Sequence, residues 1–350
     1  MTTKQFTKTE IIFIKLCHGL VQTCDRINQG QPAYKVDYSQ PFPQSLHEAF
    51  QTLSMKWIRQ EEHKLRHPSI LCMIEAARRS VSEIDPAFED FVDFPDQPLV
   101  ERMSHPSEEC EAWASEYGLS LERDQNQSYI PRLMNEIKRF GLPESTYTHF
   151  RRFIAENPFP TDADLAMLKH RCSDIEPVSN LLLEAYREPP TLPSSVSLCK
   201  TCGGFLDCAA KTVAGCCEKL ETSVTRVPIP DTVICLIRPA LIEMRLFKAL
   251  QKLGLEVDLW PSLDQVDIAI KFLTGEMWAL DAKDWGSATR LARELEQETI
   301  PDVGQSRSFF VIPDYRWNDL AYRSTFLSRY HKSIPVLSEQ MLLAKAEENI

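Results

Sequence analysis

The residues best suited to chemistry lie in the last third of the chain, where Asp267 is followed by Asp281-Ala282-Lys283. Two carboxylates on neighbouring strands form a site for a hard divalent cation such as Mg²⁺ or Mn²⁺, which prefers oxygen ligands and keeps several waters. Such a metal lowers the pKa of a bound water and offsets the charge that develops on a phosphate during hydrolysis. Lys283 could orient the attacking water or stabilise that charge. Glu243, near the start of a predicted helix, could reach the same metal or a second one.

The register of a predicted β-hairpin brings these residues together. Residues 266–272 and 276–283 both alternate between apolar and polar side chains, and the loop between them ends at Gly275, in the position where such loops prefer a left-handed residue. This register sets Ile268 opposite Leu280, and a slip of one residue would send the two apolar sets to different faces, which burial forbids. The alternation therefore predicts one shared face for Asp267, Asp281 and Lys283.

Further elements must surround the hairpin. Pro239 can begin a helix that Gly254 ends, and a short strand is expected at 256–260. After the hairpin, the pattern predicts a helix over 287–298 and a buried strand over 308–312, and then another helix. On the helix after the hairpin, Arg290 and Arg293 could contact phosphate, but Glu294, Glu296 and Glu298 make a solvated face an equal reading.

This order of elements resembles the PD-(D/E)xK nuclease core of restriction-endonuclease-like (REase) proteins, an α/β fold, over residues 235–345. In particular, the chain resembles the REase encoded beside prokaryotic Piwi-type (pPIWI-RE) and helicase genes in defence loci. The likeness rests on the Arg238-Pro239 helix, the Leu259-Trp260-Pro261 turn and the run at 281–285, behind a cysteine knuckle. Val266 stands where the motif's nominal proline would be.

The resemblance implies an Mg²⁺-dependent endonuclease that hydrolyses phosphodiester bonds of DNA, with an RNA–DNA hybrid or a single strand as other substrate forms. It implies Asp267, Asp281 and Glu243 as metal ligands, Lys283 as the catalytic lysine, and a Piwi-like protein and a helicase as partners. The alternative is a non-catalytic, zinc-containing adaptor that binds a protein or nucleic acid on a nuclease-like scaffold. Exposed acids on a sheet face would give a similar pattern.

Five cysteines crowd into residues 199–217, where Cys199-x-x-Cys202 precedes two glycines. A tight turn of this kind lets backbone amides face the sulfurs, and a structural Zn²⁺ takes four such ligands at about 2.3 Å. Buried or free thiols are the alternative, and a redox function of the C-x-x-C is less favoured because no strand precedes it. The pattern predicts a zinc knuckle over 195–230 with four ligands drawn from Cys199, Cys202, Cys208, Cys216 and Cys217.

Residues 1–187 are predicted to be mainly helical, with three- and four-residue apolar spacings over 7–27, 45–63, 68–83, 107–117, 131–140, 144–156 and 162–171. A helical hairpin over 130–154 concentrates basic and aromatic residues, among them Arg132, Lys138, Arg139, Arg151 and Arg152. Such a hairpin could contact phosphates, or it could be a solvated face that balances neighbouring acids.

The overall charge works against bulk nucleic-acid binding, since 39 basic and 50 acidic residues give a formal net charge of −11. Most of the acidic excess lies before residue 190, and a Pro- and Ser-rich segment at 187–198 suggests a boundary there. Scattered cysteines, an amphipathic start and no long apolar run favour a cytoplasmic protein without a membrane contact. We therefore expect weak binding of nucleic acid by the isolated chain and delivery by a partner.

Overall fold

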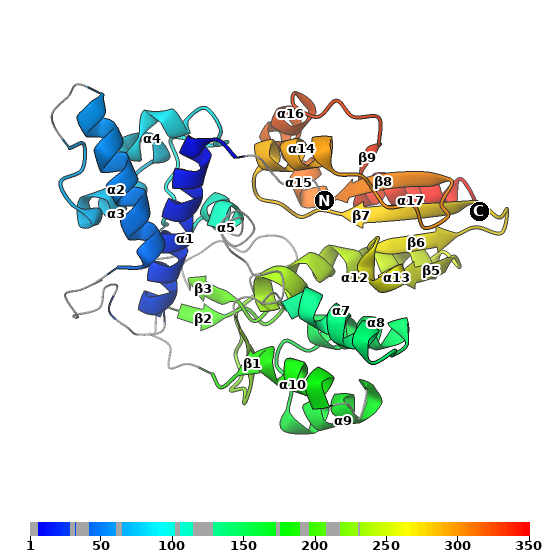
Figure 1. Ribbon diagram of the computed structural model, residues 1–350. Coiled ribbons are helices and arrows are strands. Elements are labelled where there is room, and N and C mark those ends of the chain that lie inside the picture. The colour runs from blue at the N-terminus through cyan, green and yellow to red at the C-terminus, as the bar shows by residue number, and fades with distance from the viewer. Residues whose placement is uncertain are drawn as a thin grey trace. The chain divides into compact units, whose positions relative to one another are not determined.

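The computed structural model describes residues 6–28, 32, 42–60, 65–101, 106–114, 129–172, 176–189, 196–207, 218–229 and 232–350. The chain forms two compact units (Figure 1). The first consists of Met1–Asp124, Pro190–Ser197 and Phe205–Ala210. The second consists of Gln125–Pro189, Leu198–Gly204 and Lys211–Ile350.

The first unit is helical, as the apolar spacing predicts. The helix expected over 68–83 is interrupted at residues 78–80, because the Ser80 side chain accepts a hydrogen bond from the backbone N–H of Glu83 and caps a new helix. Its elements are α1 (Lys8–Asn28), α2 (Gln44–Arg59), α3 (Ile70–Ala77), α4 (Val81–Ile84), the 3₁₀ turn η1 (Pro86–Phe88) and α5 (Glu108–Ala114).

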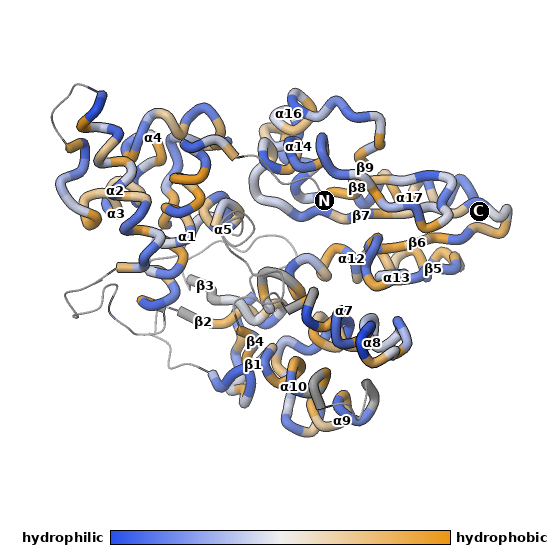
Figure 2. Tube along the Cα trace, viewed as in Figure 1, coloured by the Kyte–Doolittle hydropathy of each residue, from blue (hydrophilic) through white to orange (hydrophobic). Residues whose placement is uncertain are grey.

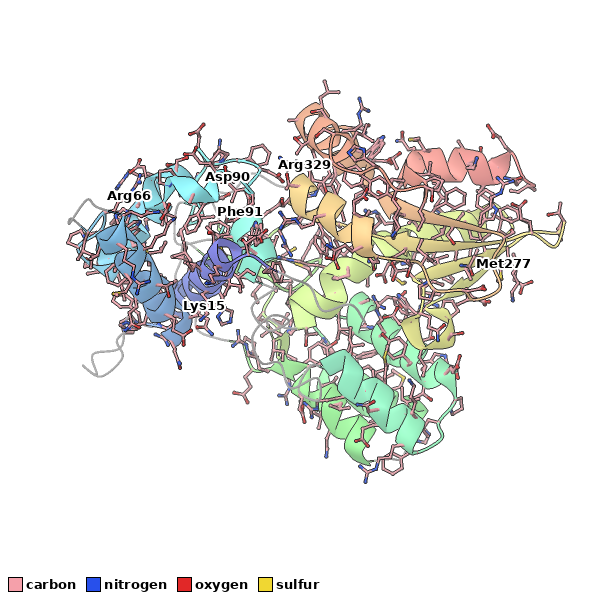
Figure 3. The ribbon with its side chains drawn as sticks, turned by 45° about the horizontal axis from the view of Figure 1, so that its top comes forward. Lys15, Arg66, Asp90, Phe91, Met277 and Arg329 are labelled. Carbon is pink, nitrogen blue, oxygen red and sulfur yellow. The ribbon has the colours of Figure 1, made fainter. Side chains whose placement is uncertain are left out.

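Aromatic rings form the centre of the first unit. The Phe13 ring lies 4.8 Å from that of Phe88 and 5.5 Å from that of Trp113, measured between ring centroids. Phe91, labelled in Figure 3, completes the group at 5.3 Å from Trp113. Large rings in edge-to-face contact bury much apolar surface, so this group stabilises the packing of α1 against α5.

The helical part of the second unit begins with the predicted hairpin. It contains α7 (Tyr129–Arg139), α8 (Glu144–Glu156), α9 (Asp162–Cys172) and α10 (Glu176–Glu184), of which α10 was not expected from the sequence. The two-residue strands β1 (Tyr186–Arg187) and β4 (Val227–Pro228) pair antiparallel. The helix α12 (Arg238–Lys252) does not begin afresh at Pro239, because the π-helical turn η3 (Val233–Ile237) continues directly into it.

A five-stranded mixed sheet follows, in the order β5-β6-β7-β8-β9. β6 is antiparallel to both β5 and β7, and β7, β8 and β9 are parallel to one another. Figure 2 shows β6 as a largely hydrophobic strand, in agreement with its burial. The strands are β5 (Glu256–Leu259), β6 (Ile268–Lys271), β7 (Met277–Ala282), β8 (Arg307–Ile312) and β9 (Val336–Ser338).

Helices pack against this sheet. The buried side chains of α14 (Ala288–Gln297) and α16 (Leu320–Leu327) form one cluster with Phe310 and Ile312 of β8. The remaining elements are α13 (Pro261–Asp264), α15 (Asp314–Trp317), α17 (Glu339–Glu347) and a small sheet of β2 (Val196–Leu198) and β3 (Phe205–Asp207). The predicted mixed α/β class with a helical N-terminal region is thus confirmed. No helix in the described part of the chain has the length and apolar character needed to cross a membrane.

Candidate active site

The β6–β7 hairpin has the register that the alternation predicts. Ile268 lies opposite Leu280, and Gly275 adopts the expected left-handed conformation with a φ of 85°. The backbone N–H of Asp267 donates to the carbonyl of Leu280 at 3.1 Å, which extends the pairing by one residue beyond β6. The hairpin therefore carries Asp267 to the end of β7, where Asp281 lies. Met277, labelled in Figure 3, begins that strand at its other end.

Asp267 and Asp281 lie beside each other in a largely buried position. The Oδ2 atom of Asp267 accepts a hydrogen bond of 2.6 Å from the backbone N–H of Ala282. Burial raises the pKa of Asp267 to about 7, and the nearby Glu243 carboxylate adds to this effect. Burial also raises the pKa of Asp281 to about 7, although Lys283 acts in the opposite direction. Two crowded carboxylates without enough compensating charge are the electrostatic condition that a divalent cation relieves.

Lys283 is held between two carboxylates. Its Nζ atom lies 2.9 Å from Asp281 Oδ1 and 3.0 Å from Glu298 Oε1, and 18% of its side chain is exposed. Burial alone would lower the pKa of Lys283, but Asp281 and Glu298 outweigh it and hold the pKa above its ordinary value. Lys283 is therefore a charged donor at neutral pH.

Glu298 belongs to this site and not to a solvated face. It caps the end of α14, and its Oε2 atom is buried with no hydrogen-bond partner. Burial raises the pKa of this carboxyl, with Asp281 as a further cause. The charge pattern of the helix gave no indication of this, because the glutamates at 294, 296 and 298 look alike in sequence.

Glu243, the third predicted metal ligand, forms an ion pair with Arg151. Only 2% of its side chain is exposed, and both of its carboxylate oxygens lie 2.9 Å from Nη2 of Arg151 on α8. The indole Nε1 of Trp260 also donates to Glu243 Oε2, at 2.5 Å. Burial raises the pKa of Glu243 and Arg151 opposes that shift. The sequence gave no sign of this pairing, because the two residues are 92 positions apart.

Arg151 also connects to the segment that follows β5. Its guanidinium forms an ion pair with Asp264 and stacks over the Trp260 ring, 4.4 Å from the centroid. The Tyr147 hydroxyl, one turn earlier on α8, donates to Asp264 Oδ2 at 2.7 Å. We call Arg151, Glu243, Trp260 and Asp264 the Arg151 network. Sequence reasoning placed Arg151 on either a phosphate-binding or a solvated face, and it lies on neither, since only 4% of its side chain is exposed.

The backbone of this segment is strained. Trp260, Ser262, Leu263 and Asp264 all have positive φ values, from 52° to 67°. Among the described residues, these are the only non-glycine residues in that conformation. Each costs about 1 kcal/mol or more, so surrounding contacts must hold the segment in place. The Arg151 network supplies such contacts from both Trp260 and Asp264.

The donor set fits a divalent cation through two carboxylates. Within the described ranges, no cluster of three or more His, Cys, Asp and Glu side chains is arranged as metal ligands. Mg²⁺ is often held by only one or two carboxylates together with waters and substrate phosphates. Asp267 and Asp281 supply these, and the unpartnered Oε2 of Glu298 provides a further oxygen beside Lys283.

The cysteine segment is only partly described. Cys199 and Cys202 are buried on a tight turn, where the backbone N–H of Thr201 donates to Cys199 Sγ at 3.4 Å and Gly203 has a φ of 74°. The turn expected of a knuckle is therefore present. No zinc-binding group is found among the described residues, and the other candidate ligands, Cys208, Cys216 and Cys217, lie outside them.

Three of the other basic candidates contact residues of the protein itself. Arg132 pairs with Glu184, and Arg152 pairs with Glu156. The guanidinium of Arg290, which is buried on α14, lies 4.9 Å from the centroid of the Trp285 ring.

A mixed sheet whose central hairpin carries two carboxylates and a lysine is the arrangement expected of a restriction-endonuclease-like domain. Residues 240–350 match a family described as "REase associating with pPIWI_RE", and residues 23–161 match one described as "pPIWI_RE three-gene island domain Y". Together the two matches support a pPIWI_RE-associated, REase-like protein, so the resemblance inferred from the sequence is confirmed. The match to domain Y was not expected. No curated protein and no solved structure matched the chain.

Proposed function

We propose that this protein is a metal-dependent nuclease that hydrolyses phosphodiester bonds of DNA. The observation that carries the proposal is the cluster of Asp267, Asp281 and Lys283 at one end of the β6–β7 hairpin. Asp267 and Asp281 would hold Mg²⁺ or Mn²⁺, which activates a water and offsets charge on the phosphate. Glu243 joins them as a third ligand only when it is not bound by Arg151.

Lys283 has a defined part in this reaction. Because its pKa is raised, the ammonium group keeps its protons and donates hydrogen bonds. A fixed donor beside the reacting phosphate stabilises the negative charge that grows on its oxygens in the transition state. Glu298 Oε1, 3.0 Å from the Nζ atom, helps Asp281 to orient Lys283. Lys283 therefore serves charge stabilisation and not proton abstraction, because its ammonium group has no lone pair to accept a proton.

The setting of this activity is proposed from the family descriptions, which we extend to this chain. We infer that the protein acts in a prokaryotic defence system beside a pPIWI_RE protein, with a helicase as a further partner. The net charge of −11 supports delivery of the nucleic acid by such partners. The non-catalytic adaptor would retain partner binding without cleavage.

The test is a cleavage assay on duplex, single-stranded and RNA–DNA hybrid substrates, with each divalent metal and with EDTA. The parent protein should cleave with Mg²⁺ or Mn²⁺, alone or with its partners, and chelation should abolish the reaction. Asp281→Asn should lower the rate by about 100-fold or more, because a metal ligand and its charge are removed. Partner binding without cleavage under every metal would establish the adaptor instead.

We also propose a structural zinc at the knuckle. The buried Cys199 and Cys202 sulfurs, with a backbone amide directed at Cys199, form half of such a site, and the three remaining cysteines can complete it. Elemental analysis should find about one zinc per chain, and Cys202→Ser should lower that content. Cys72→Ser, at an exposed cysteine of α3, is the matched control and should leave it unchanged. A metal-free parent protein would contradict the proposal.

A further inference from the structure

The carboxylate of Glu243, an expected metal ligand, is already engaged by Arg151. In the structure the guanidinium contacts both carboxylate oxygens of Glu243, and Trp260 donates to one of them, so the oxygens that a metal would use already have donors. Among the described residues, Arg151 and Glu243 are the only ion pair in which both side chains are less than one-twentieth exposed. A buried pair of this kind is tightly coupled, because removal of either partner leaves an uncompensated charge.

The contact between Arg151 and Glu243 also joins two parts of the chain that match different families. Arg151 and Tyr147 lie on α8, inside residues 23–161 that match domain Y. Glu243, Trp260 and Asp264 lie inside residues 240–350 that match the REase family. All five belong to the second compact unit. A residue from the domain Y segment thus reaches a carboxylate expected of the nuclease site.

We propose that Arg151 is an autoinhibitory positioning residue that keeps Glu243 out of the metal site until α8 is displaced. With α8 docked, the site contains Asp267 and Asp281 and binds a divalent cation weakly. When Arg151 leaves, Glu243 loses its counter-charge and becomes available as a third carboxylate ligand. The strained segment at 260–264 places Trp260 and Asp264 against Arg151, so this segment is part of the same autoinhibitory contact. This inference rests on the proposed function.

The test measures Mn²⁺ affinity by titration calorimetry on the full-length chain and does not depend on catalysis. Arg151→Met should tighten Mn²⁺ binding by about tenfold, within the usual range of coupling between two sites. Glu243→Gln should leave the affinity within about twofold of the parent value, since Glu243 is not a ligand while Arg151 holds it. The double variant should return to the parent affinity, because the released carboxylate is missing.

Two further variants separate the competition from simple structural support. Arg151→Lys keeps the positive charge beside Glu243 and should bind Mn²⁺ like the parent protein. Arg152→Met changes the neighbouring arginine of α8, which pairs with Glu156, and should also have no effect. Glu243→Gln keeps one acceptor oxygen for Arg151, whose charge is still paired with Asp264, so it remains informative even if Arg151→Met does not fold.

The outcomes distinguish the two proposals. A loss of Mn²⁺ affinity of tenfold or more in Glu243→Gln would show that Glu243 is already a ligand and would overturn the autoinhibition. A folded Arg151→Met variant with unchanged or weaker affinity would do the same. If Asp281→Asn binds Mn²⁺ as well as the parent protein, the metal site itself is misplaced and the proposed function fails with it.

Discussion

At the scale of single residues, the acids of this protein differ sharply in what surrounds them. Asp267 and Asp281 share a largely buried position, and the pKa of each is raised to about 7. The negative charge of Glu243, in contrast, is compensated by its ion pair with Arg151. The first two were predictable from sequence, because strand alternation is local and fixes their common face. The engagement of Glu243 was not, since it depends on an arginine 92 residues away.

A different buried acid should make the stability of the first unit depend on pH. Glu109 of α5 accepts a hydrogen bond from the backbone N–H of Asp93 at 3.0 Å, and burial raises its pKa from 4.5 to about 7. The folded state therefore holds a proton that the unfolded chain releases above pH 4.5. As a result, the free energy of unfolding should fall as the pH rises from about 4.5 to 7 and then level off.

Glu109→Gln removes this effect. The variant should be more stable than the parent at pH 8, by about 1 kcal/mol once partial exposure to solvent is allowed for, and the difference should shrink towards pH 4.5. Urea titrations of both proteins at pH 5 and pH 8 measure it. A gain that is equal at both pH values would show that the Glu109 carboxyl does not titrate in this range.

At the scale of elements, the sequence predicted regular structure well and irregular structure poorly. The hairpin, the strands β5 and β8 and most helices of the first unit follow apolar periodicity, so their positions could be read directly. The π-helical turn before α12 and the left-handed segment at 260–264 could not, because they depend on tertiary contacts and not on a repeating pattern.

Two substitutions by glycine, with opposite expected effects on stability, test the left-handed segment at 260–264. Ser262 has a φ of 54°, where glycine avoids the steric cost of a Cβ atom. Ser262→Gly should stabilise the second unit by about 0.5 kcal/mol, after the greater entropy of unfolded glycine is subtracted. Ser324→Gly, at an exposed position of the right-handed helix α16, should destabilise it by about 0.5–1 kcal/mol. Urea unfolding measures both, and destabilisation by Ser262→Gly would contradict the described backbone.

At the scale of the whole molecule, composition and contacts divide the chain differently. The Pro- and Ser-rich segment at 187–198 suggested a boundary between a helical region and a nuclease-like domain. In the structure α7 to α10 belong to the same compact unit as the sheet, and the Arg151 network is one of the contacts that join them. Such a contact between distant residues leaves no trace in composition, so the sequence alone could not reveal it.

The central claim is that Lys283, held beside Asp281, acts in metal-dependent cleavage of nucleic acid. The most direct measurement compares cleavage rates in Mn²⁺ for the parent protein, Lys283→Met and Lys271→Met. Lys271 lies exposed on β6 and pairs with Glu256 and Asp258, so it is a matched lysine outside the site. We predict a loss of about 100-fold or more for Lys283→Met and a parent-like rate for Lys271→Met. Equal cleavage by all three proteins would contradict the account.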